Sequence, residues 1–512
     1  MQDKIIGEGG LSMPGSSGRI KSNRKTDYPP TDYERIFHPR TLAIVGVSAE
    51  EGGAGFGTGM LKSTMAMGFE GKIYPVNPKG GNISGMEIFK RVEDIPEKID
   101  FAVIAVTARH VPEAVEACRK KGATGAEILS SGFGELGTEE GKALEKQLQE
   151  TATRGIRVIG PNCFGIYCPA SGLTMLPGPD LSRISGPVAF LAQSGGMAID
   201  LAHAGNYLGI RFSKMVSFGN GADLRESELL HYLADDPETQ VISMYIEGIK
   251  DGEDFFLAIK KAASKKPVIV FKGGLSIAGQ RSVASHTASM GGSRVIWQSI
   301  LKQAGAIQVH DSEELAQVNL AFSLLPKKSF KSISIIGGGG AIGVTACDTA
   351  ESYGIEVPPL PARLQERIGN HLPKPGSSAI NPVDVANPYV SPQNLKEVLL
   401  IAAEDQRIEL QILDSLLYHY KPLAKMFGKP IAEITPYKEL ARAVRDVVDQ
   451  TGKPVIAVLP NPRRGPDDMD ITQLIALTRQ EYIHLGIPVF DELHDAIRAI
   501  DHINTYYGGR NK

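Results

Sequence analysis

The chain has 512 residues, of which 42% are hydrophobic and 22% are charged, and its formal net charge is −3. This near-neutral balance provides no basic field for phosphate backbones, which argues against a nucleic-acid partner. The four cysteines are few and scattered and form no CxxC pair, so we expect neither a disulfide framework nor a zinc site. No apolar run is long enough for a membrane span and no signal peptide is evident, so we expect a cytoplasmic protein of roughly three domains, with no membrane partner.

The first segment, residues 1–35, is predicted to be a disordered tail. It is rich in glycine, proline and serine, and its apolar residues follow neither the helical nor the strand period. We assign it no function.

From Thr41 onward the sequence alternates between strand-like and helix-like segments. Strands are predicted at 41–48, 72–77, 101–106, 126–130 and 156–160, and helices between them include 111–121 and 139–154. This alternation predicts an α/β, Rossmann-like domain over residues 36–180, with its ligands at the carboxyl ends of the parallel strands.

The ends of the first two strands indicate the class of ligand. A glycine-rich turn at 52–57 leads into a helix, as in phosphate-binding sites, but the G-x-G-x-x-G motif of an NAD site is missing. Lys79 follows the second strand where an NAD site would carry an acidic residue. A lysine suits a ligand with an extra phosphate near the ribose, such as coenzyme A. NADP fits less well, and a wound sheet without any nucleotide is the remaining alternative.

A second domain is predicted for residues 181–328. Its first strand, 186–192, runs into Gln193-Ser194-Gly195-Gly196 and a helix, which is again an anion-binding helix start. The strand 241–247 ends on Glu247, and the strand 267–272 leads into a predicted mobile loop that contains His286.

A third domain, residues 329–512, repeats the second. The strand 331–336 and the glycine-rich run 337–343 match the start of the second domain, and the strand 453–459 matches 266–270. The copies lie about one domain length apart, which indicates domain duplication. The third domain has Pro-Asn-Pro-Arg-Arg-Gly after Leu459 instead of the histidine loop.

Together these features predict a phosphoryl-transfer site in the second domain. His286 is the candidate nucleophile, Glu247 the carboxylate that orients its ring, and Ser194, Gly195 and Gly196 the phosphate-binding helix start. Strand ends of one parallel sheet converge, so these groups can meet. Taken singly, a loop histidine is more simply a surface residue, and Glu247 is equally well explained as a solvated strand end.

The sequence closely resembles the alpha-type subunit of the NDP-forming acyl-CoA synthetases, the ADP-forming acetate–CoA ligase type, which are related to the succinyl-CoA synthetase alpha subunit. The resemblance covers residues 36–505. The motifs that carry it are Ala43–Ser48, Gly71–Gly80, Gly160–Gly165, Ala192–Gly196, Phe218–Asn220, Ser285–Ser289 and Asn381–Asp384.

The resemblance implies a CoA-binding domain followed by two flavodoxin-like, succinyl-CoA synthetase-like domains. It implies a phosphorylated His286 oriented by Glu247, and the interconversion of acyl-CoA, ADP and phosphate with a carboxylic acid, CoA and ATP. It also implies three groups of CoA contacts: Gly46 and Ser48 at the phosphates; Pro75, Val76, Asn77 and Lys79 at the nucleotide end; and Val106, Thr107, Ser131, Gly132, Phe133, Asn162 and Cys163 along the pantetheine.

Two departures from the family pattern matter. No P-loop is present and no chain remains after residue 505 for an ATP-grasp module, so we expect ATP/ADP and Mg²⁺ to be supplied by an ATP-grasp beta-type subunit in a hetero-oligomer. The glycine-rich insertion at 50–59 leaves the first phosphate contacts open. The alternatives are a catalytically silent CoA-binding or acyl-CoA-binding regulator, and an NADP-dependent dehydrogenase.

Overall fold

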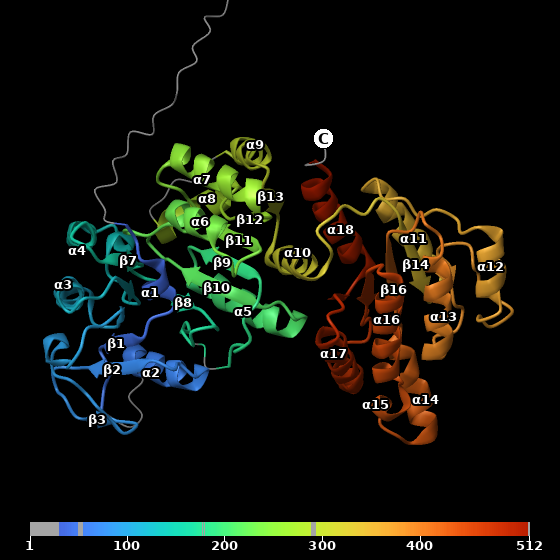
Figure 1. Cartoon of the computed structure of the whole chain (residues 1–512), viewed down its shortest axis with the longest axis horizontal. Helices are drawn as coiled ribbons and strands as arrows, with labels where there is room; N and C mark the ends of the chain where they lie inside the picture. The colour runs from blue at the N-terminus through green and yellow to red at the C-terminus, as the bar shows by residue number, and fades with distance from the viewer. Residues whose placement is uncertain (1–29, 50–54, 177, 179, 288–292, 510–512) are drawn as a thin grey trace, which may run out of the picture.

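The computed structural model describes residues 30–49, 55–176, 178, 180–287 and 293–509. Three main sheets follow one another along the chain (Figure 1). The first two lie side by side at the left of the view, and the third, drawn in yellow to red, lies at the right, with helices α10 and α18 between. This is the predicted parallel-sheet α/β architecture.

The first sheet is entirely parallel, in the order β2-β1-β5-β6-β7. Its strands are short, mostly apolar runs, and all their residues except the first two of the edge strand β2 are buried, as expected of a sheet covered by helices. The elements of this region are α1 (Tyr33–Phe37), β1 (Thr41–Val45), α2 (Phe56–Met67), β2 (Lys72–Val76), the hairpin β3 (Asn82–Ile83) and β4 (Met86–Glu87), η1 (Val92–Asp94), β5 (Phe101–Ile104), η2 (Ala108–His110), α3 (Val111–Lys120), β6 (Gly125–Ile128), η3 (Gly134–Leu136), α4 (Glu139–Ala152) and β7 (Arg157–Ile159).

The second sheet has the order β13-β12-β11-β9-β10-β8, with β8 antiparallel to its neighbour β10. β8 lies within the predicted first domain, residues 36–180, and its backbone completes the edge of the second sheet. The elements are β8 (Gly165–Tyr167), β9 (Val188–Ala192), α5 (Gly195–Leu208), β10 (Phe212–Ser217), α6 (Glu226–Asp235), β11 (Val241–Ile246), α7 (Gly252–Lys265), β12 (Val268–Lys272), α8 (Ile277–Thr287), α9 (Arg294–Ala304), β13 (Ile307–Val309) and α10 (Ser312–Leu324).

The third sheet is parallel, in the order β15-β14-β16-β17-β18. Its elements are β14 (Ile333–Gly337), α11 (Gly340–Ser352), α12 (Ala362–Gly369), β15 (Val383–Asp384), α13 (Pro392–Ala403), β16 (Leu410–Asp414), η4 (Leu417–His419), α14 (Tyr420–Phe427), α15 (Ile431–Ile434), α16 (Tyr437–Thr451), β17 (Val455–Val458), η5 (Pro466–Asp468), α17 (Met469–His484), β18 (Val489–Phe490) and α18 (Leu493–Gly508).

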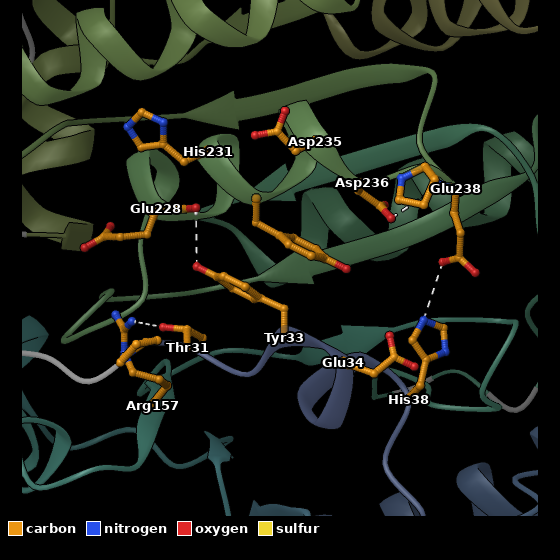
Figure 2. A pocket seen from close by; sticks show the side chains of 13 residues that line it. Thr31, Tyr33, Glu34, His38, Arg157, Glu228, His231, Asp235, Asp236 and Glu238 are labelled. Atoms are coloured by element: carbon orange, nitrogen blue, oxygen red, sulfur yellow. Dashed lines mark hydrogen bonds and ion pairs between the residues drawn. The ribbon is translucent and has the colours of Figure 1, made fainter.

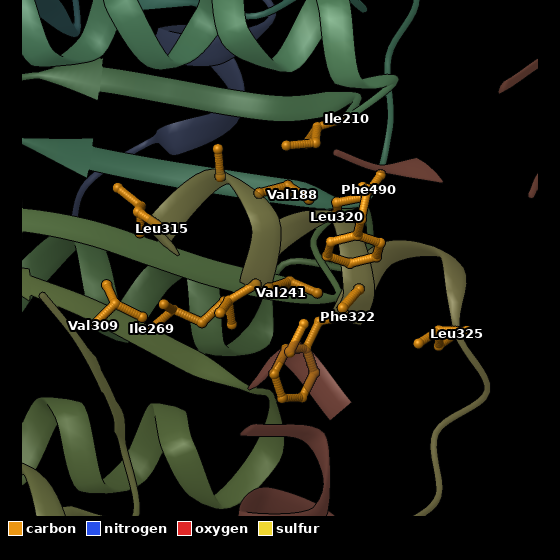
Figure 3. Packing of buried hydrophobic residues seen from close by; sticks show 14 of the residues in the cluster. Val188, Ile210, Val241, Ile269, Val309, Leu315, Leu320, Phe322, Leu325 and Phe490 are labelled. Atoms are coloured by element: carbon orange, nitrogen blue, oxygen red, sulfur yellow. The ribbon is translucent and has the colours of Figure 1, made fainter. Parts of the chain in front are cut away.

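One continuous apolar core joins the second and third sheets through α10 (Figure 3). Val188 and Ile269 come from strands of the second sheet, Leu320 and Phe322 from α10, and Phe490 from β18 of the third sheet; all five side chains are at least 96% buried. Burying such side chains contributes roughly 1.5–3 kcal/mol each. The third sheet is therefore packed onto the second.

The predicted tail of residues 1–35 ends earlier than expected, because α1 already begins at Tyr33. Asp32 caps this helix, and Arg35 forms an ion pair with Asp100 at 2.6 Å. The ring of Tyr33 stacks on that of Tyr232 with centroids 4.2 Å apart. These tertiary contacts, which a short sequence window does not contain, order residues 30–35. Residues 1–29 lie outside the described part.

A buried ion pair joins the first and second units. Arg157 on β7 binds Asp223 with two hydrogen bonds of 2.9 Å, and the side chains are 8% and 1% exposed. The backbone beside Asp223 runs along β7 and its following loop, with hydrogen bonds from Leu224 N to Val158 O and from Ala222 N to Gly160 O. The end of β10 is thereby held against the end of β7.

In the described ranges, no helix has both the length and the apolar composition that crossing a membrane requires.

We predict that Asp223→Ala lowers the free energy of unfolding by about 3–5 kcal/mol, because it removes the carboxylate that neutralises the buried Arg157 guanidinium. Thermal unfolding followed by calorimetry checks this value. The matched control is Asp446→Ala, which breaks the more exposed ion pair between Lys396 and Asp446 and should move the transition little. Equal shifts for the two variants would contradict the role given to the Arg157–Asp223 pair.

Candidate functional site

The sequence-predicted CoA contacts lie at the carboxyl edge of the first sheet, in the last two residues of β2 and in the loops that follow the strands. Backbone hydrogen bonds tie their loops together in sheet order: Gly46 N donates to Val76 O at 2.9 Å, and Asn162 N donates to Ser130 O at 2.9 Å. The hydroxyl of Ser130 donates to the carbonyl of Val106. The structure therefore brings these loops to one edge.

The turn after β1 requires glycine. Gly46 has a φ of +108°, and a Cβ atom there would lie 2.4 Å from the carbonyl oxygen of Ala105. Gly57 of α2 packs as closely on Gly46, and Ser48 N donates to Thr58 Oγ1 at 2.9 Å. The start of α2 is thus fixed beside the end of β1. Residues 50–54 of the insertion lie outside the described part.

The turn after β2 presents a lysine to solvent. Pro75 and Val76 are buried in the strand, while Lys79 is exposed and its backbone N–H donates to Asn77 Oδ1 at 3.0 Å. Within the described residues, the Lys79 ammonium has no ion-pair partner. It is therefore available to an anionic group at this edge.

The loop after β6 forms a row of backbone N–H groups that its own carboxylates occupy. Glu135 accepts from Gly132 N at 2.6 Å and from Phe133 N at 3.1 Å. Asn220, from the second sheet, donates to Glu135 at 2.5 Å and to Glu145 at 3.1 Å. Sequence reasoning missed both glutamates, which share Asn220 as a partner from a distant part of the chain. Ser131 is exposed.

The residues at the other two strand ends differ in exposure. Val106 is half-buried and Thr107 is exposed, so both border the edge. Asn162 is half-buried, and its amide lies 3.4 Å from Asn220 Oδ1. Cys163 is buried: its thiol donates to Ile128 O at 3.2 Å, and burial raises its pKa. The Cys163 thiol is thus part of the packing under the edge.

The predicted phosphate-binding helix start is present in the second sheet. β9 runs into α5, and the hydroxyl of Ser194 accepts from Met197 N at 3.4 Å, which caps the helix. Gly195 packs against the ring of Phe164, where a Cβ atom would lie 2.6 Å from the ring, and Gly196 is exposed. First-turn N–H groups lack partners inside a helix and can bind an anion.

Glu247 lies directly beside this helix start, because β11 and β9 are neighbours. The carboxamide oxygen of Gln193 accepts from the backbone N–H of Glu247 and from that of Gly248, the latter at 2.9 Å. Tyr245 donates its hydroxyl to Glu247 Oε1 at 3.1 Å. The carboxylate is buried and oriented. Gln193 stands inside a motif that the sequence had singled out, but its link to Glu247 exists only in the fold.

Lys272, a third neighbour at this edge, was not predicted. It ends β12, is 3% exposed, and donates to the carbonyl oxygen of Glu247 at 2.7 Å. Burial lowers the pKa of its ammonium to about 8, although Glu247 acts in the opposite direction.

His286 is in a helix, where the sequence predicted a loop. α8 extends over Ile277–Thr287, and the Ser276 hydroxyl accepts from Gly279 N at 3.0 Å at its start. Residues such as Gln280, Arg281 and Ala284 favour helix, which outweighs the nearby glycines. The side chain of His286 and residues 288–292 lie outside the described part.

The two edges meet. Helix α8 contacts η3, the turn that follows Ser131–Phe133 of the first sheet. The chain after β10 also reaches the loop after β7, where Asn220 N donates to Pro161 O at 3.0 Å. The histidine helix therefore approaches the loops of the first sheet, an arrangement suited to passing a group between two ligand sites.

The third sheet repeats the glycine turn without the histidine helix. Asp384 accepts from Gly339 N at 3.3 Å at the start of α11. Asp414, at the end of β16, is buried, and its carboxylate has no hydrogen-bond partner among the residues that the structure describes; burial raises its pKa to about 7.

A cavity of about 910 Å³ lies elsewhere, at the seam between α1 and α6 (Figure 2). None of the predicted site residues lines it. Two of its acids are paired with Lys214, Asp236 at 3.0 Å and Glu238, and His38 Nε2 lies 3.5 Å from Glu238. It is not the candidate site. In the part of the chain that the structure describes, no cluster of three or more His, Cys, Asp or Glu side chains could hold a metal ion.

Two family models match separate parts of the chain. The family model described as a CoA binding domain matches residues 40–169, and the model described as a succinyl-CoA ligase like flavodoxin domain matches residues 185–322.

Two curated relatives and one solved structure are similar over nearly the whole chain. The alpha subunit of acetate–CoA ligase [ADP-forming] I from Pyrococcus furiosus is 35% identical, over 91% of this chain and 96% of the relative. Acetate–CoA ligase [ADP-forming] I from Archaeoglobus fulgidus is 33% identical over 92% of this chain, which spans 63% of that longer protein. The structure of dinucleotide forming acetyl-coenzyme A synthetase 1 from Ca. Korarchaeum cryptofilum, in complex with phosphate and ADP, has a TM-score of 0.79 and 30% identity, covering 94% of this chain and 98% of its own.

Glu127, on β6 beneath the edge, gives a prediction for pH dependence. It is 2% exposed, burial raises its pKa from 4.5 to about 8, and a hydrogen bond from Ile166 N at 2.8 Å acts against this. Between these two values the folded chain keeps a proton that the unfolded chain has released, so this group's contribution to stability falls as the pH rises. Glu127→Gln should lose this decline, and thermal unfolding from pH 4.5 to 8 measures it. Glu150→Gln, at an exposed position on α4, should keep the wild-type profile; an unchanged profile for Glu127→Gln would contradict the assignment.

Proposed function

Since this chain belongs to the ADP-forming acyl-CoA synthetases, the family of the acetate–CoA ligase alpha subunits, we propose that it is their CoA-binding, phosphohistidine-carrying subunit. The observation that carries the proposal is the contact between α8, which holds His286, and η3 at the edge of the first sheet. A phosphoryl carrier has to reach the place where the acyl group leaves its thiol.

The residues of the first sheet fit coenzyme A. The exposed Lys79 offers a cation for a phosphate, and the close packing at Gly46 and Gly57 brings backbone near the ligand. Ser48 and Asn77 stand at the same strand ends, and Ser131, Gly132, Phe133 and Asn162 border the path toward the second sheet, with Val106 and Thr107 beside it. The bound CoA supplies the thiol that carries the acyl group.

In the proposed reaction, acyl-CoA, ADP and phosphate are interconverted with a carboxylic acid, CoA and ATP. A phosphate oxygen attacks the thioester carbonyl carbon, and the thiol leaves as an acyl phosphate forms. An imidazole nitrogen of His286 then attacks phosphorus, the bond to the acyl oxygen breaks, and the carboxylate leaves. ADP finally takes the phosphoryl group from the nitrogen.

The chain's own residues have distinct tasks in this scheme. Glu247, held by Gln193 and Tyr245, orients the ring of His286 and stabilises its positive charge during attack. The start of α5, at Ser194, Gly195 and Gly196, offsets the charge of the phosphoryl group.

We propose that an ATP-grasp beta-type subunit supplies the nucleotide site and its Mg²⁺, in a cytoplasmic hetero-oligomer. The relative from Pyrococcus furiosus is itself named as an alpha subunit, and the Archaeoglobus fulgidus relative is a longer single chain, which supports a division of one activity between two parts.

Labelling tests the phosphohistidine. The chain is incubated with an ATP-grasp subunit and ATP labelled on the γ-phosphate. We expect acid-labile label on the wild type and none on His286→Ala, because the phosphoryl group has lost its acceptor. His203→Ala, on α5, is the matched control and should keep the label. CoA binding without label in the wild type would instead indicate a silent CoA-binding regulator.

Ligand binding tests the role of Lys79. If its ammonium contacts the 3′-phosphate, the wild type should bind CoA more tightly than 3′-dephospho-CoA by about 1.5–3 kcal/mol, which is roughly 10- to 150-fold. Lys79→Ala should bind the two ligands equally, as measured by calorimetry. Lys120→Ala, at the far end of α3, should retain the difference; a retained difference in Lys79→Ala would refute the contact.

A further inference from the structure

We propose that Lys272 is a positioning residue of the phosphoryl-transfer step: its buried ammonium ties the root of the histidine helix to the strand end that carries Glu247, and offsets the negative charge of the bound phosphoryl group. The inference rests on the proposed function and adds a residue to its site.

The first support is the position of Lys272 between three elements. Its Nζ donates to the carbonyl oxygen of Glu247 at 2.7 Å and also to that of Gly273, with which the connection into α8 begins. It lies 5.0 Å from the ring centroid of Trp297 on α9, the helix that follows α8 in the chain. One ammonium thus contacts the segments that enter and leave the histidine region, together with the end of β11.

The second support is its charge. Among the described residues, Lys272 has no carboxylate within ion-pair distance, and carbonyl dipoles and an aromatic face surround it instead. Glu247 is the titratable group whose charge acts on it, and burial has the larger, opposite effect on its pKa. A buried cation that lacks a close carboxylate is costly, so such a residue is expected where a ligand brings negative charge.

The third support is an internal comparison. In the third sheet, β14 with its glycine turn pairs with β16, as β9 pairs with β11. Asp414 lies opposite Gly337 as Tyr245 lies opposite Ala192, so Asp414 corresponds to Tyr245, two residues before Glu247. Val458 of the next strand, β17, pairs with Asp414 as Phe271 of β12 pairs with Tyr245, so Leu459 occupies the position that corresponds to Lys272. The copy that has no histidine segment after this strand therefore has an aliphatic residue where the second sheet has Lys272.

The chemistry follows from linkage. A phosphoryl group on His286 adds up to two negative charges near the edge, which favours the charged form of Lys272. By the same coupling, a charged Lys272 favours the phosphorylated protein. The neutral form, populated as the pH rises past about 8, should favour it less.

The same strand provides a matched control. Lys266 precedes β12 at the opposite edge of the sheet, and its Nζ likewise donates to two backbone carbonyls, of Leu233 and Asp236, at 2.6 Å each. Burial lowers its pKa too. It shares the local chemistry of Lys272 but lies away from the site.

The experiment measures acid-labile phosphate on the full chain at equilibrium with an ATP-grasp subunit and labelled ATP, at pH 7 and at pH 9. Lys272→Gln keeps a hydrogen-bond donor and removes the charge, so we expect a labelled fraction lower by about tenfold, with CoA affinity unchanged. Lys272→Arg keeps its charge at both pH values and should gain label relative to the wild type as the pH rises. Lys266→Gln should label as the wild type does.

The outcomes distinguish failure of the proposed phosphohistidine function from failure of the role given to Lys272. Absence of label on the wild type overturns both. If the wild type is labelled and a folded Lys272→Gln is labelled to the same fraction, only the role of Lys272 is overturned. If calorimetry shows that Lys272→Gln does not fold, Lys272→Arg provides the test. The charge coupling is rejected if the labelled fraction of Lys272→Arg, divided by that of the wild type, is the same at pH 7 and at pH 9.

Discussion

The structure depends on the way the chain after β10 is held along β7. Backbone hydrogen bonds and the buried pair of Arg157 and Asp223 fasten this segment across the boundary between the first two sheets. Because each parallel sheet collects its loops at its carboxyl edge, joining the ends of β7 and β10 also brings the two sets of loops together. A ligand at one edge is then within reach of groups from the other.

Within the second sheet, hydrogen bonds across neighbouring strand ends build the site. Gln193 follows β9 but binds the backbone after β11, and Lys272 ends β12 but binds the same backbone from the other side. Glu247 is therefore held from both neighbours, and its own side chain by Tyr245. Such a buried, hydrogen-bonded group keeps its orientation without rearrangement during a reaction.

The duplicated third domain shows which of these features belong to the scaffold. It retains the glycine turn and the order of its central strands, and its buried carboxyl group, Asp414, corresponds in register to Tyr245. It has neither the lysine nor the histidine segment after β17. Features common to both copies belong to the wound sheet itself, whereas Lys272 and His286 are specific to the second copy.

The sequence by itself determined the fold class, the alternation of strands and helices along the chain, and the candidate histidine. Buried parallel strands and glycine turns can be recognised in local runs such as Thr41–Val45 and Ser194–Gly196. It did not predict β8 or the start of α1 at Tyr33, whose partners lie far away in the chain, and it expected a loop at α8. Only the tertiary structure decided that Gln193, Lys272 and Glu247 share one edge and that α8 meets η3. The physical reason is that these contacts join residues 54 and 25 positions apart, or more, and no local pattern encodes such a pairing.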